Sequence, residues 1–143
     1  MISEYFEDWE VKSEFKPEFI SLWEGWLGKE NYHKLDEVTE LEWLRFNALI
    51  KLIHKEYELY AVNLELNTAL KIEEIESYLP SHKEAMNRDS SKFSKLIIPE
   101  LSAVLNEDWD YTYILWHKNN GAKEILSSFV RNAELFQFGK KST

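Results

Sequence analysis

The feature that most constrains the fold is an apolar stripe that recurs at helical spacing in the second quarter of the chain. Its members step by three or four residues and are Trp43, Phe46, Ile50, Ile53, Tyr57 and Tyr60. Because a helix turns once every 3.6 residues, these side chains share one face. Thr39 followed three residues later by Glu42 is a capping-box pattern, which marks a helix start. The sequence therefore predicts a long central helix over about residues 40–62.

Two shorter helices are predicted on either side of the central one. In residues 17–27, Pro17 suits a first helical turn, and five apolar residues follow at three-to-four spacing before Gly28. Asn67 or Thr68 suits a further helix start, and the stripe of Ile72, Ile75 and Leu79 then ends at Pro80. The first part of the chain is thus interpreted as helical.

Beyond residue 92 the helical period fades and aromatic and branched residues typical of strands take over. Strands are predicted over residues 93–98, 101–106 and 111–118, with the acidic segment Glu107–Asp110 joining the last two as a hairpin. A helix over 122–133 and an edge strand over 135–138 follow. We expect one α+β domain over residues 1–143: N-terminal helices, then a small, mainly antiparallel sheet on which the C-terminal helix packs.

An all-α fold is the alternative to this α+β prediction. The segment Leu96–Leu105 can also form a helix that carries Pro99 in its first turn. A short apolar run of this kind is compatible with a helix or a strand, so periodicity alone does not choose between the two folds.

Charge is distributed unevenly along the chain. Residues 1–80 hold 18 acidic and 8 basic side chains, whereas residues 81–143 hold 8 and 9, and the formal net charge of the whole chain is −9. An acidic surface repels phosphate backbones and anionic lipid headgroups. The expected partner is therefore a basic protein, with no direct binding to nucleic acid and none to a membrane.

Composition also indicates a compartment. The chain contains no cysteine, so disulfides are excluded, and its first ten residues lack the basic start and apolar stretch of a signal peptide. We expect a cytoplasmic protein.

The motifs of common enzymes and metal sites are missing from the sequence. No two of His33, His54, His82 and His117 stand three to five residues apart, and the acidic segment 107–110 lacks the glycine and terminal glutamate of a calcium loop. No Gly-x-Ser-x-Gly segment and no phosphate-binding glycine loop is present. We expect no metal, no cofactor and no enzymatic activity.

The unusual feature is the placement of tryptophans among acids. Trp109 lies between Asp108 and Asp110, Trp9 lies between Asp8 and Glu10, and Trp43 follows Glu40 and Glu42. Tryptophans anchor many protein interfaces, and neighbouring acids select a basic partner. The sequence therefore predicts a partner-binding surface made of Glu107, Asp108, Trp109, Asp110, Glu7, Asp8, Trp9 and Glu40.

Three functional hypotheses follow from these features. The first is a non-catalytic acidic binding module, such as an immunity protein or an inhibitor of a basic, nuclease-type toxin. The second is a small hydrolase or lyase that uses His117 with carboxylates, which requires a pocket holding both groups. The third is a structural homodimer that buries the surplus aromatic side chains, and it is compatible with either of the others.

Overall fold

An antiparallel sheet forms the centre of the molecule. The computed structural model describes residues 1–87, 89, 92–118 and 120–139. Within them seven strands pair in the order β5-β4-β6-β7-β8-β3-β9. Their bounds are β3 Lys16–Ser21, β4 Tyr60–Asn63, β5 Thr68–Lys71, β6 Lys95–Ile98, β7 Ala103–Asp108, β8 Thr112–His117 and β9 Phe136–Phe138. The α+β class is confirmed, but the sheet is larger than predicted.

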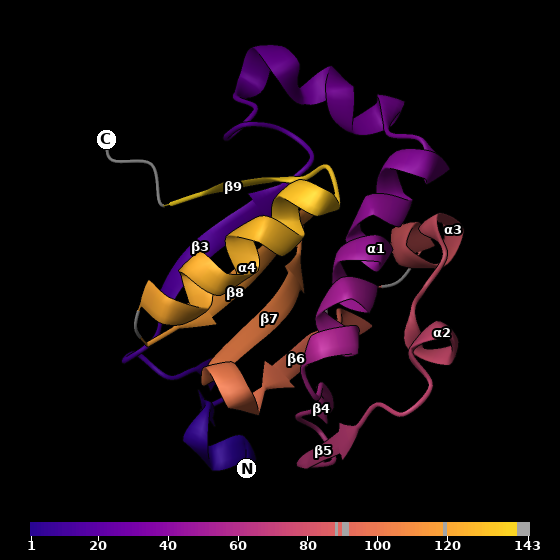
Figure 1. The fold of residues 1–143 in the computed structure, drawn as a ribbon. Helices are drawn as coiled ribbons and strands as arrows, with labels where there is room; N and C mark the ends of the chain where they lie inside the picture. The colour runs from indigo at the N-terminus through magenta and orange to yellow at the C-terminus, as the bar shows by residue number, and fades with distance from the viewer. Residues whose placement is uncertain (88, 90–91, 119, 140–143) are drawn as a thin grey trace.

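Two helices cover one face of this sheet, as Figure 1 shows. Helix α1 spans Glu40–Glu56 and helix α4 spans Asn120–Asn132. The remaining helical segments are short: η1 Ile2–Glu4, η2 Lys29–Glu37, α2 Ile75–Tyr78, α3 His82–Asn87 and η4 Pro99–Leu101. No helix of the described residues is both long and apolar enough to span a bilayer.

The start of α1 confirms the predicted capping box. The Thr39 hydroxyl accepts a hydrogen bond from the Glu42 amide at 3.2 Å, and the Glu42 carboxylate accepts one from the Thr39 amide at 3.1 Å. The stripe faces the core, where Trp43, Phe46, Ile50 and Ile53 are buried. Local sequence therefore determines where this helix begins and which side it buries.

The predicted end of this helix at residue 62 is wrong. The helix stops at Glu56, and Tyr60–Asn63 forms β4 instead. Tyr60 and Ala61 pair with Ile97 and Leu96 of β6. Tyrosine and valine favour strands, so this pairing outweighs the continued helical spacing of Tyr57 and Tyr60.

The predicted helix over residues 17–27 is also wrong. Residues 16–21 form β3, which lies between β8 and β9 in the sheet. Pro17 is tolerated because β9 pairs only with residues 19–21, which leaves one side of β3 open at the proline. Residues 22–28 then run as an irregular loop that carries Trp23 and Trp26.

The third correction concerns the helix predicted to start at Asn67 or Thr68. Thr68–Lys71 forms β5, the edge strand paired with β4, and only Ile75–Tyr78 is helical. Asn67 adopts a positive φ of 52° in the hairpin turn rather than capping a helix. Asparagine tolerates this left-handed conformation better than most residues, which suits it to the turn.

The prediction is most accurate in the second half of the chain. β6, β7 and β8 overlap the three predicted strands, α4 overlaps the predicted C-terminal helix, and β9 pairs at the sheet edge with β3. The all-α alternative is wrong, because Pro99 begins the short η4 turn between β6 and β7.

The opposite face of the sheet carries a second, smaller core. Strands β1 (Phe6–Glu7) and β2 (Glu10–Val11) form an N-terminal hairpin. This core contains the buried Tyr5, Phe6 and Phe15, which cluster with Ile97 of β6 and Val104 of β7. The sheet is therefore buried on both sides over these central strands.

Candidate partner-binding surface

The β7–β8 tip, residues 108–111, projects a tryptophan from one end of the sheet. Asp108 pairs with Thr112, and the three residues between them form the turn. The Trp109 side chain is 59% exposed, and its ring stands edge-on to Phe93 with 4.9 Å between centroids. An exposed indole held by one neighbouring ring is available to another molecule.

The carboxylates of this tip form no ion pair in the described part of the chain. Asp110 is exposed and Asp108 is half-buried, and neither forms an ion pair within 4.0 Å with a described residue. Burial raises the pKa of Tyr111, and the negative charges of Asp36 and Glu42 raise that pKa further. The end of the sheet around the tip is thus a region of negative potential.

Aromatic rings fix the base of the tip. The Tyr111 hydroxyl is 3.0 Å from Nε2 of His82, and the Tyr111 ring packs against Trp23 and Trp43. The Trp43 indole in turn donates a hydrogen bond to the Pro80 carbonyl at 3.2 Å. These contacts tie the turn to α1 and α3, so the tip is held in one orientation.

Trp109 lines two cavities. The first, of about 180 Å³, lies toward Trp43, Phe93 and Tyr113. The second, of about 170 Å³, lies toward the loop after β3 and η2, which contribute Trp26 and Tyr32. Both cavities are lined by Asp108 and Asp110, so each combines aromatic rings with carboxylates.

Glu107 is the predicted surface residue that the structure places inside the fold. Glu107 is only 8% exposed, and its carboxylate accepts a hydrogen bond from the Ser94 amide at 3.0 Å. The Glu107 amide donates to the Ser94 carbonyl at 2.8 Å. Glu107 therefore joins β7 to the start of β6, and it also lines the cavity of about 180 Å³ beside Trp109.

Replacing Glu107 with alanine is expected to lower the free energy of unfolding by about 1–3 kcal/mol, since a buried Ser94 amide loses its partner. Glu107→Gln retains an acceptor oxygen and is expected to cost less. Urea denaturation of both variants measures the difference. Equal losses in the two variants would contradict the role of the Ser94 hydrogen bond.

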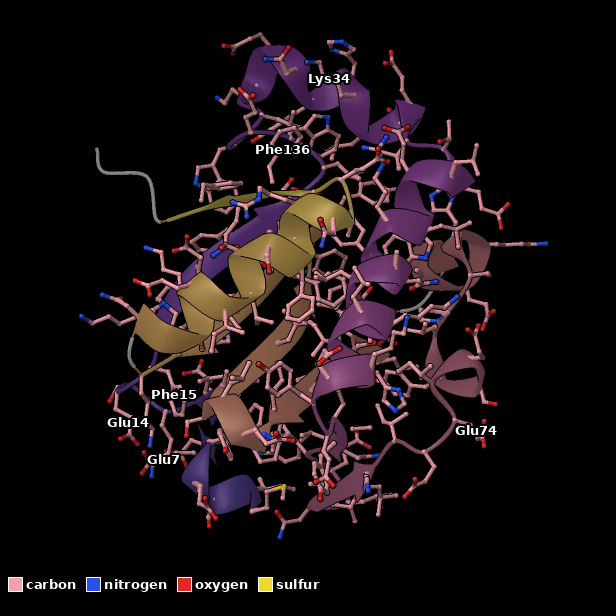
Figure 2. The ribbon with its side chains drawn as sticks, in the orientation of Figure 1. Glu7, Glu14, Phe15, Lys34, Glu74 and Phe136 are labelled. Carbon is pink, nitrogen blue, oxygen red and sulfur yellow. The ribbon has the colours of Figure 1, made fainter. Side chains whose placement is uncertain are left out.

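The second predicted acidic tip, Glu7–Trp9, lies elsewhere on the molecule. Asp8 and Trp9 form the two-residue turn of the β1–β2 hairpin, with φ of 50° and 70°, and Trp9 is 64% exposed. Glu7 lies far from Lys34 of η2 in Figure 2, whereas η2 adjoins the β7–β8 tip. Trp9 lines neither cavity beside Trp109, but it lines another cavity, of about 610 Å³, together with Phe93, whose ring contacts Trp109.

Glu40, the last of the predicted surface residues, is the exposed first residue of α1. It lines neither of the two cavities beside Trp109. Its neighbour Glu42 contributes to the negative potential at Tyr111 instead.

The histidines do not gather into a site within the described residues. His117 is buried at the end of β8, in register with Lys16 and Ala103, and it lines neither cavity beside Trp109. Among the described residues, no group of three or more His, Asp or Glu side chains could hold a metal ion.

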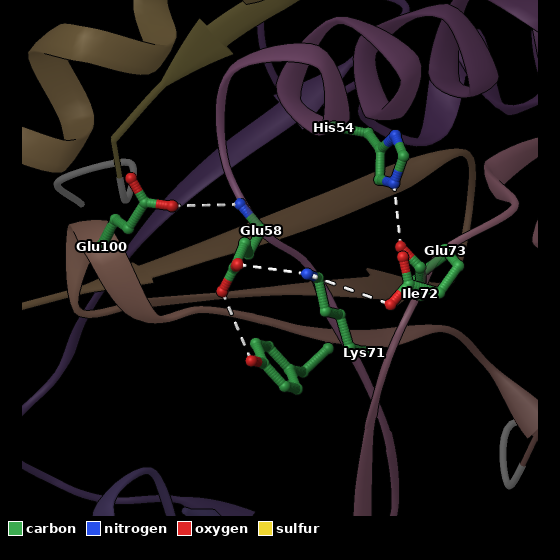
Figure 3. A network of polar contacts seen from close by, with 7 residues as sticks. His54, Glu58, Lys71, Ile72, Glu73 and Glu100 are labelled. Atoms are coloured by element: carbon green, nitrogen blue, oxygen red, sulfur yellow. Dashed lines mark hydrogen bonds and ion pairs between the residues drawn. The ribbon is translucent and has the colours of Figure 1, made fainter.

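His54 and Glu58, which stand four residues apart, bind different partners (Figure 3). His54 Nε2 is 2.9 Å from the Ile72 carbonyl, while Glu58 lies 3.2 Å from the Lys71 ammonium. Hydrogen bonding and charge from Glu58 raise the pKa of Lys71. The Glu58 amide also donates to the Glu100 carboxylate at 3.2 Å. This network connects the end of α1 with β5 and η4, and its contacts are those of residues that stabilise the fold.

Sequence reasoning missed the contribution of residues 23–36 to this surface. Trp26 and Tyr32 are exposed and line the cavity beside Trp109, and Asp36 acts on Tyr111. Their aromatic and acidic character was visible in the sequence, but the helix predicted over residues 17–27 placed Trp26 on a core-facing stripe.

Comparisons of the chain with protein-family models, with curated proteins and with solved structures each return no match.

Proposed function

We propose that the protein is a non-catalytic binding module that holds a basic partner protein through the β7–β8 tip. The observation that carries this proposal is the exposed Trp109 between two carboxylates that form no ion pair with a described residue. A tryptophan supplies contact area at low entropic cost, and unpaired acids attract a cationic surface.

The rigidity of the tip supports the same role. Tyr111 is held by His82, Trp23 and Trp43, so binding orders little that is not already ordered. Binding through a preordered surface loses little conformational entropy, so most of the free energy of the contacts contributes to affinity.

A nuclease-type toxin is the partner class that we favour. A nuclease needs a positive surface to hold phosphate groups, and an acidic protein covering that surface blocks substrate binding. In this role the present chain is an immunity protein or inhibitor, and its acidic tip takes the place of the nucleic-acid backbone.

The test uses Asp108→Asn together with Asp110→Asn. Partners are captured from the source cell with wild-type protein, purified, and mixed with each variant in stopped-flow measurements at several salt concentrations. Because opposite charges accelerate encounter, we expect the wild-type association rate to fall about tenfold or more as salt screens the interaction. The double variant is expected to associate about 3–10-fold more slowly at low salt and with a weaker salt dependence.

Glu56→Gln together with Glu124→Gln is the matched control. Both residues are exposed. Glu56 is the last residue of α1, whereas Tyr111 of the tip contacts Trp43 in the first turn of that helix. Glu124 lies in the first turns of α4, which follows the end of β8, whereas the tip precedes the start of β8. This variant loses the same charge as the tip variant, and its association rate is expected to change less than about twofold. Equal effects of both variants, or a rate that ignores salt, would contradict the proposal.

A further inference from the structure

One cavity of this surface has the chemistry of a cation site. The Trp26–Trp109 pocket, of about 170 Å³, lies between the loop after β3, η2 and the β7–β8 tip. Its rings are Trp23, Trp26, Tyr32 and Trp109, and its carboxylates are Asp108 and Asp110. Residues from two segments more than 70 positions apart in sequence thus converge on one small volume.

The rings of the pocket are positioned by other rings. Trp26 stands edge-on to Phe19 at 4.7 Å and to Phe138 at 5.2 Å, which are strand residues of β3 and β9. Trp109 stands edge-on to Phe93 at 4.9 Å. Trp26 and Trp109 nevertheless remain exposed, as does Tyr32. The pocket is therefore preformed and open, which lowers the cost of filling it.

The charge of the pocket is negative and uncompensated within the described residues. None of its lining residues is basic, and its two carboxylates make no ion pair with a described residue. Lys34 lines a neighbouring depression with Trp26 and is absent from this pocket. A cation entering between the rings meets the faces of aromatic systems and two carboxylates together.

We infer that this pocket receives an arginine side chain of the basic partner. A guanidinium is planar, stacks on aromatic rings and bonds carboxylates with two N–H groups, and it sheds water more readily than an ammonium. A cavity of about 150 Å³ holds a benzene molecule in another protein, so a guanidinium with its adjoining methylene groups is of suitable size. The inference rests on the proposed function, and it specifies which group of the partner is bound.

The test titrates ¹⁵N-labelled protein with the peptide acetyl-Gly-Arg-Gly-amide. Each of the six tryptophans gives one indole N–H signal, and Trp→Phe variants assign those of Trp26 and Trp109. We expect both signals to shift saturably with a Kd of roughly 1–10 mM, since one side chain supplies only a few contacts. The neutral peptide acetyl-Gly-Gln-Gly-amide is expected to leave both signals unchanged, and the lysine peptide is expected to bind more weakly.

The combined Asp108→Asn and Asp110→Asn variant is expected to bind the arginine peptide at least about tenfold more weakly, equivalent to 1.4 kcal/mol. The Glu56→Gln and Glu124→Gln variant is expected to bind it normally. An absent shift, an equal response to the glutamine or lysine peptide, or undiminished binding by the tip variant would each overturn the arginine site.

The two proposals fail in different ways. If the arginine peptide does not bind while association with the captured partner still depends on salt and on the tip carboxylates, the pocket inference fails and the binding function stands. If the peptide binds but partner association ignores the tip, the function proposal fails. Thermal unfolding of each variant confirms that the fold is retained.

Discussion

Replacing Trp109 with alanine is expected to weaken binding of the basic partner by about 2–4 kcal/mol, which corresponds to roughly 30- to 1,000-fold in Kd. The indole is 59% exposed in the β7–β8 turn, and it lines both cavities that carry the tip carboxylates. Its loss removes the contact area at the centre of the proposed interface. Isothermal titration calorimetry with the purified partner measures the change.

Trp9→Ala is the matched control for this prediction. Trp9 is 64% exposed and also sits in a hairpin turn beside acids, but it lines neither of the two cavities that carry Asp108 and Asp110. Its replacement is expected to change the binding free energy by less than about 1 kcal/mol. If Trp9→Ala weakens binding and Trp109→Ala does not, the β1–β2 hairpin is the docking surface, and the assignment to the β7–β8 tip is wrong.

Phe46→Ala is expected to lower the free energy of unfolding by about 3–5 kcal/mol. Phe46 is 0% exposed in the middle of α1, and its ring packs on Trp43 at 5.5 Å and on Tyr113 at 5.3 Å. The substitution would leave a cavity between α1 and β8, where the Phe46 ring now packs on Tyr113. Since domains of this size are stable by about 5–15 kcal/mol, this loss is a large fraction of the total.

Urea denaturation tests this expectation against Leu44→Ala on the same helix. Leu44 is 42% exposed, so its replacement removes little buried surface and is expected to cost less than about 1 kcal/mol. Similar losses in the two variants would show that the apolar stripe of α1 is not the core of the protein.

Some elements could be predicted because their causes are local. The capping box at Thr39 and Glu42 places the start of α1, and the hairpin between β7 and β8 follows from two strand-like runs joined by a short acidic turn. Helix α4 likewise follows from its apolar period. In each case the signal and the structure lie within about twenty residues.

The candidate site was only partly predictable from sequence. The order Asp108, Trp109, Asp110 in a turn pointed to an exposed tip, and the structure places Trp109 there. Whether the side chain of Glu107 faces inward depends on the pairing of β7 with β6, which single-sequence patterns do not reveal. The convergence of Trp26 with Trp109 depends on where the loop after β3 passes.

The sequence by itself determined the central helix start, the antiparallel hairpin and the acidic character of the chain, because capping, periodicity and charge act over a few neighbouring residues. Only the tertiary structure decided that residues 16–21 are a strand, since their partners in β8 lie about a hundred positions away. It also decided which acids face solvent. Strand pairing is energetically favourable only when distant segments meet, so the same apolar residues that fit a helix locally become a strand in the sheet.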